Sequence, residues 1–167
     1  MRTLLTRRSL LTGSAAFFGT GIAPSLAQQA APRFGGLRVD TTPPANRGSS
    51  GAAAAVQQIM PAKMQDVFGD IVAAGARGLP VLVARIDTLY LPGYADTDPG
   101  MVYSLQQDTM SGAGVVVAGR AVQSSTPLHV NLPPSYSGTW YLPDIDTRRI
   151  DSLCYQFAYW LRREMQL

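Results

Sequence analysis

The alternating run between residues 81 and 91 constrains the fold more than any other feature of this chain. Four of its apolar side chains would share one face of an extended strand: Leu82, Ala84, Ile86 and Tyr90. Arg85 and Asp87 would lie on the opposite face, because successive side chains of a strand point to opposite faces. A strand of this pattern belongs to a sheet that is covered on one side only.

Two segments carry the helical spacing of apolar residues. In residues 52–74 the stripe consists of Val56, Met60, Met64, Val67, Phe68 and Ile71. Pro61 lies inside this segment, and because proline lacks a backbone donor it should kink the helix or split it into two. In residues 146–165 the stripe consists of Ile150, Leu153, Cys154, Phe157 and Leu161. These two helices are expected to cover the sheet.

Three more strands are predicted from alternation and turn residues. They span residues 37–41, 112–118 and 121–132, and a tight turn at Gly119-Arg120 joins the last two. The order is therefore β-α-β-β-β-α. We expect an α+β, two-layer sandwich with a four-stranded, mostly antiparallel sheet and two helices on one face. A right-handed crossover should place the first two strands in parallel.

The N-terminus resembles a twin-arginine export signal, which carries proteins across the membrane after they have folded. Arg7-Arg8 precedes an apolar run that starts at Leu10, and small residues end it at Ala27. We expect residues 1–27 to be the signal, residues 28–36 a flexible linker and residues 37–167 one domain. Retention of the signal as an anchor is the alternative. No later stretch is apolar enough to span a membrane.

The positive net charge belongs to this signal. The chain has 14 basic and 11 acidic residues, and three of the basic ones are Arg2, Arg7 and Arg8. Removing these three leaves 11 basic residues against 11 acidic ones, a formal net charge of zero. Without a basic stripe the exported chain lacks the electrostatic basis for binding nucleic acid.

The chain holds no convincing catalytic, metal or cofactor constellation. His129 is its single histidine, so any triad or zinc centre would have to use a residue from the outer face of a predicted strand. Asp96-Thr97-Asp98 resembles the start of a calcium loop but lacks the later ligands. Cys154 cannot form an internal disulfide, because it is the only cysteine, and it fits a buried apolar position. We therefore expect neither an enzyme nor a cofactor.

Two surfaces are candidates for binding a partner. The first is the loop 133–143, whose Tyr136, Trp140 and Tyr141 could form an aromatic platform or could cover an open end of the core. The second is the outer sheet face, which carries Arg85, Asp87, His129 and Asn131. If no layer covers that face, it could pair with a partner or remain a solvated surface.

Four motifs give the chain a resemblance to small exported bacterial proteins of unknown function. They are Leu37 to Asp40, Met60-Pro61, Val83 to Asp87, and the aromatic helix segment Phe157 to Leu161. The resemblance implies no known activity. The order of elements is also similar to that of periplasmic accessory domains, such as the auxiliary subunits of lipid-transport ABC systems, although this likeness is one of topology alone.

These observations favour an exported accessory or interaction protein of the cell envelope, located in the periplasm. Its expected partners are the twin-arginine translocase and signal peptidase during export, and an envelope protein afterwards. A domain that binds a small ligand or lipid between its helices and sheet is the alternative. A cavity of a few hundred Å³ at that place would favour this alternative.

Overall fold

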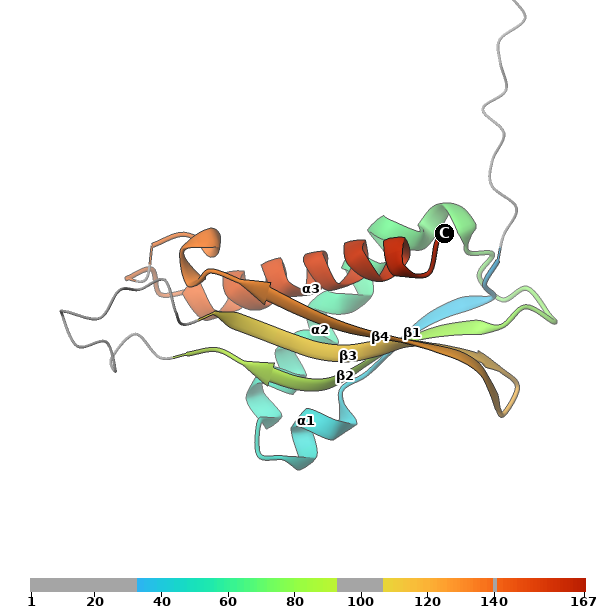
Figure 1. Cartoon of the computed structure of the whole chain (residues 1–167), viewed down its shortest axis with the longest axis horizontal. Coiled ribbons are helices and arrows are strands. Elements are labelled where there is room, and N and C mark those ends of the chain that lie inside the picture. Colours follow the sequence, from blue (N-terminus) through green and yellow to red (C-terminus); the bar gives the residue numbers. More distant parts are fainter. Residues whose placement is uncertain (1–32, 93–106, 140) are drawn as a thin grey trace, which may run out of the picture.

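The computed structural model describes residues 33–92, 107–139 and 141–167 (Figure 1). The predicted signal with Arg7 and Arg8, its cleavage site after Ala27 and the linker up to residue 32 lie outside the described residues. So do the acidic segment 96–98 and Trp140.

The sheet has four strands in the order β1-β2-β3-β4. They are β1 (Gly36–Asp40), β2 (Val81–Tyr90), β3 (Asp108–Ala118) and β4 (Ala121–Leu132). β1 is parallel to β2, as the crossover rule predicts, and the other two pairs are antiparallel. The α+β class is confirmed, and the sheet is mixed. β3 begins four residues before its predicted start, because residues 108–111 pair with residues 129–132 at the end of β4.

Among the described residues, three helices accompany the sheet: α1 (Thr42–Asn46), α2 (Ser50–Phe68) and α3 (Ile145–Glu164). Two short 3-10 turns, η1 (Gly69–Ile71) and η2 (Pro134–Ser137), follow α2 and β4. The sequence pattern did not predict α1. Its prolines, Pro43 and Pro44, stand in the first turn, where a missing backbone donor costs nothing. Pro61 does not split α2, which is one continuous element.

One hydrophobic core lies between the sheet and the two long helices. Its sheet side includes Leu82, Ala84, Ile86 and Met110, all fully buried. Its helix side includes Met60, Met64 and Phe68 of α2, and Leu153, Cys154, Phe157 and Leu161 of α3. Both helices therefore cover the same face, and α3 runs nearly along the strands (Figure 1). Burial of Cys154 raises the pKa of its thiol to about 12.

A bulge in β2 changes which side chains reach the core. The pairing of β2 with β3 shifts between Ile86 and Thr88. The extra residue reverses the alternation beyond it. Leu89 consequently packs against the core, and Tyr90 is 59% exposed. The prediction that Tyr90 shares the core face was wrong for this reason.

Gly114 allows α3 to approach the sheet closely. A Cβ atom at this position would lie 2.5 Å from Cδ1 of Leu161 and 3.0 Å from its Cγ. Both distances are shorter than van der Waals contact, so a side chain at residue 114 would require the fully buried Leu161 to shift. The glycine is thus explained by packing between helix and sheet.

Candidate functional site

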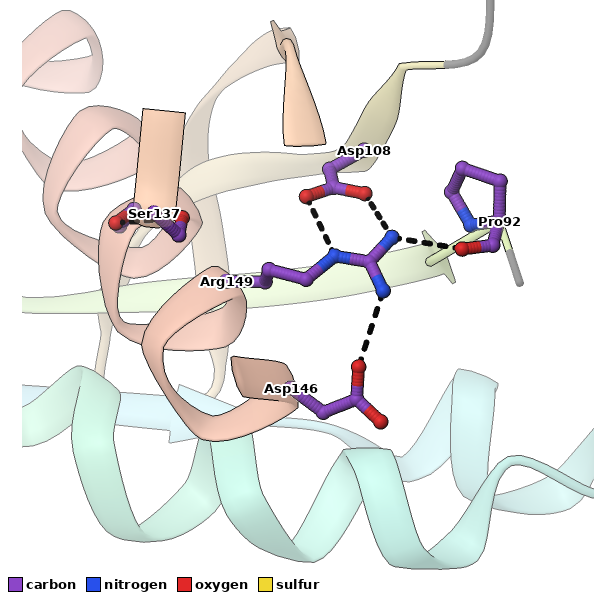
Figure 2. A network of polar contacts seen from close by, with 6 residues as sticks. Pro92, Asp108, Ser137, Asp146 and Arg149 are labelled. Atoms are coloured by element: carbon purple, nitrogen blue, oxygen red, sulfur yellow. Dashed lines mark hydrogen bonds and ion pairs between the residues drawn. The ribbon is translucent and has the colours of Figure 1, made fainter. Parts of the chain in front are cut away.

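The two buried charged residues of the described chain, Asp108 and Arg149, pair with each other. Arg149 donates from Nε to Asp108 Oδ2 at 2.9 Å and from Nη2 to Asp108 Oδ1 (Figure 2). It also donates to the carbonyl oxygen of Pro92 at 2.9 Å and to Asp146 Oδ1 at 3.0 Å. The guanidinium is surrounded by protein acceptors. The cluster joins the end of β2 and the start of β3 to α3, and we interpret it as structural.

Within the ranges that the structure describes, no three histidine, cysteine or acidic side chains are grouped in a way that could hold a metal ion. In the same ranges no helix combines the length and the apolar character needed to cross a bilayer.

The structure places Arg85 and His129 on the same outer face of the sheet. Arg85 in β2 and His129 in β4 are separated by β3, and each is bonded to a neighbour. Arg85 Nε lies 3.0 Å from Asp87 Oδ1. Ser111 Oγ lies 2.6 Å from His129 Nδ1. On this polar face Arg85 is paired with Asp87, and His129 is bonded to Ser111. Because β3 separates the two strands, Arg85 and His129 do not form a reactive pair.

The aromatic loop after β4 lies against α3. Tyr136 is 59% exposed and Tyr141 is 68% exposed, so these two rings do not cover the core. Gln156 of α3 donates to the Tyr136 hydroxyl at 3.4 Å. The loop candidate and the outer sheet face are therefore two different surfaces, and Tyr136 belongs with α3.

The exposed side of α3 carries a row of aromatic rings that was not predicted as a site from the sequence. Tyr155, Tyr159 and Trp160 are between 39% and 44% exposed. Tyr155 and Tyr159 stack with their ring centroids 6.3 Å apart, and Tyr159 meets Trp160 edge to face at 5.5 Å. The guanidinium carbon of Arg163 lies 5.0 Å from the Trp160 ring centroid. The signal in the sequence was the spacing of four between tyrosines outside the core stripe.

A groove of about 220 Å³ connects this row to the edge of the sheet. Its walls are residues 128–132 of β4 on one side, and Gln156, Trp160 and Glu164 of α3 on the other. His129 lies on the β4 wall. We call Tyr136, Tyr155, Tyr159 and Trp160, together with this groove, the α3 aromatic surface. It joins Tyr136, which was predicted from the sequence, to rings that were missed; His129 only borders the groove, because it belongs to the outer sheet face.

Comparisons of the chain with known proteins gave no matching family model, no matching curated protein and no matching solved structure.

Proposed function

We propose that this protein is an exported, periplasmic accessory protein of the cell envelope that binds a protein partner through the α3 aromatic surface. The observation that carries the proposal is the row formed by Tyr155, Tyr159 and Trp160, which are about 40% exposed and packed against one another. Tyrosine and tryptophan are the residues that most often dominate the energetics of protein interfaces.

The packing of these rings also favours tight association. Ordering a flexible side chain at an interface costs roughly 0.5–1.5 kcal/mol. Tyr159 stacks on Tyr155 and meets Trp160 edge to face. These contacts, and the cation–π contact from Arg163 to Trp160, restrict the rings before a partner arrives. Gln156 and Glu164 border the same groove and offer polar groups of the kind that surround interface cores.

The alternative of a ligand or lipid held between helices and sheet has less support. That space is occupied by side chains with no solvent exposure, among them Met60, Met64, Phe157 and Leu161. A lipid chain could enter only by displacing them. The groove beside β4 holds about 220 Å³, which is less than the roughly 300–1,000 Å³ of usual small-molecule sites. A groove of about 580 Å³ beside β1 reaches that size, but its α2 wall consists of the exposed residues Gln57, Pro61 and Gln65, so it lies at the surface and not between the helices and the sheet.

Export by the twin-arginine route is part of the proposal and rests on Arg7-Arg8. Substituting both arginines by lysine keeps the charge and should stop export by this route. Cell fractionation would show wild-type protein in the periplasm and the Arg7→Lys/Arg8→Lys variant in the cytoplasm. Periplasmic recovery of the variant would contradict this part of the proposal and leave the binding surface unaffected.

The binding surface is tested by photo-crosslinking in intact cells. A photoreactive residue at Tyr155 should give a crosslinked product with one envelope protein, and Trp160→Ala should abolish that product. A photoreactive residue at Val122, which is 64% exposed on β4, is the matched control and should give none. The same product from Val122, or one that survives Trp160→Ala, would refute the proposed surface.

A further inference from the structure

A second groove, of about 580 Å³, lies at the opposite edge of the sheet. One wall is formed by four consecutive residues of β1: Gly36, Leu37, Arg38 and Val39. The other wall is formed by Gln57, Pro61 and Gln65, which follow one another at intervals of four along α2, and by Val72 and Ala74. Because consecutive strand residues line it, the groove runs beside the backbone of β1.

The strand registers show which backbone groups of β1 face this groove. The two-residue turn after Ala118 makes Ala118 and Ala121 a hydrogen-bonded pair, so the odd-numbered residues of β3 face β2 and Leu82 and Ala84 of β2 face β1. In the parallel register of β1 with β2, Gly36 and Arg38 therefore present their backbone groups to β2. The N–H and C=O groups of Leu37 and Val39 point to the outer edge, where Gly75 donates to the Gly35 carbonyl and no strand pairs with β1 in the described sheet.

The two edges of the sheet differ in how they resist another strand. β4 contains Pro127, which cannot donate a hydrogen bond, and its pairing with β3 has a register shift near Val116. Both features are known to protect edges. β1 contains neither proline nor a register shift over its five residues. β1 is therefore the edge that is open to a short added strand.

The side chains beside this edge indicate what such a strand would carry. Leu37 and Val39 face the core layer, so added residues on that side would enter the groove next to Pro61 and Val72. Arg38 is exposed on the other face and has no hydrogen bond or ion pair with another described residue. None of the residues that line the groove is acidic.

We propose that the β1 edge binds an extended peptide segment of a partner protein by strand addition. The segment alternates small apolar side chains, which enter the groove, with an acidic side chain that faces Arg38. Main-chain bonds to Leu37 and Val39 supply affinity, and the two side-chain positions supply specificity. This site lies at the other edge of the sheet from the α3 aromatic surface and does not depend on it.

The probes are short acetylated peptides centred on Val-Asp-Val, with Val-Lys-Val as the matched control. Titrated into isotopically labelled protein, the first should shift the amide resonances of Leu37 and Val39. The lysine peptide should bind up to about fivefold more weakly, which is the range expected for an exposed ion pair. Arg38→Ala should remove this preference, and Arg120→Ala, in the β3–β4 turn, should keep it.

Two further peptides test the strand geometry, each N-methylated on alternate amides in one of the two registers. Only the peptide methylated on the amides that face β1 should lose binding. Equal binding of both peptides would overturn strand addition. Shifts confined to β4 and α3, or no shifts at millimolar peptide, would overturn the site itself without affecting the crosslinking result at Tyr155.

Discussion

Arg149 in the first turns of α3 and Asp108 at the first residue of β3 form a buried ion pair across 41 positions of the sequence. The side chains are 2% and 1% exposed. The same guanidinium binds the carbonyl oxygen of Pro92, so one residue holds both ends of the segment between β2 and β3 (Figure 2). This pair fixes the start of α3 against the sheet, next to the loop that carries Tyr136.

Breaking this pair should destabilise the fold strongly. Arg149→Met leaves the Asp108 carboxylate buried without its partner, and we expect a loss of about 3–5 kcal/mol in the free energy of unfolding. The double variant Arg149→Met/Asp108→Leu should recover much of that loss. Urea denaturation of the single and the double variant measures these changes in the free energy of unfolding. Arg148→Met is the control and should cost little, because the Arg148–Asp144 pair is exposed. A double variant less stable than the single one would contradict this explanation.

Gly114→Ala should also destabilise the protein, by about 1–3 kcal/mol, because the added methyl group requires the fully buried Leu161 to shift. Gly51→Ala at the start of α2 is the matched control, since nothing lies within 4 Å of its added Cβ. That control should leave stability unchanged or raise it slightly. Thermal unfolding followed by circular dichroism compares the two; equal midpoints would argue against close packing at Gly114.

Trp160→Ala should separate binding from folding. Trp160 is 40% exposed, so its removal should change stability by less than about 1 kcal/mol while abolishing the crosslink from Tyr155. Phe157→Ala, one turn earlier and fully buried, should cost about 3–5 kcal/mol. If Trp160→Ala unfolds the protein as readily as Phe157→Ala, the ring is part of the core and not of a binding surface.

The Asp70–Arg162 pair should make stability depend on acid. Arg162 donates to both Asp70 oxygens at 2.7 Å, and these hydrogen bonds lower the pKa of the carboxyl group. The stabilisation is complete above the unfolded-state pKa of about 3.9 and is lost as the pH falls through the lower folded-state value. Wild type should therefore melt above Asp70→Asn at neutral pH, with the difference shrinking below about pH 4. A pH-independent difference would contradict this.

Cys154 should be unreactive in the folded protein. Burial raises its pKa to about 12, and the thiolate that attacks alkylating reagents is almost absent at neutral pH. Iodoacetamide should label the protein only in denaturant, as mass spectrometry would show. Rapid labelling of the native protein would place Cys154 outside the core.

The sequence by itself determined which face of each element is apolar. Alternation identified Leu82 and Ile86, and helical spacing identified Leu153 and Phe157, all of which are fully buried. These patterns are readable because burying apolar surface is the main driving force of folding and acts through a local period. The α+β class and the parallel pairing of the first two strands followed from them.

Only the tertiary structure decided the features that depend on distant residues. The bulge that turns Tyr90 outward arises in pairing with β3, and the Asp108–Arg149 pair joins residues 41 positions apart. The free edge of β1 exists because of the strand order. Tyr155, Tyr159 and Trp160 lie together on the surface because α3 buries its other side. Local patterns do not encode such relationships, since they arise only when separate elements pack together.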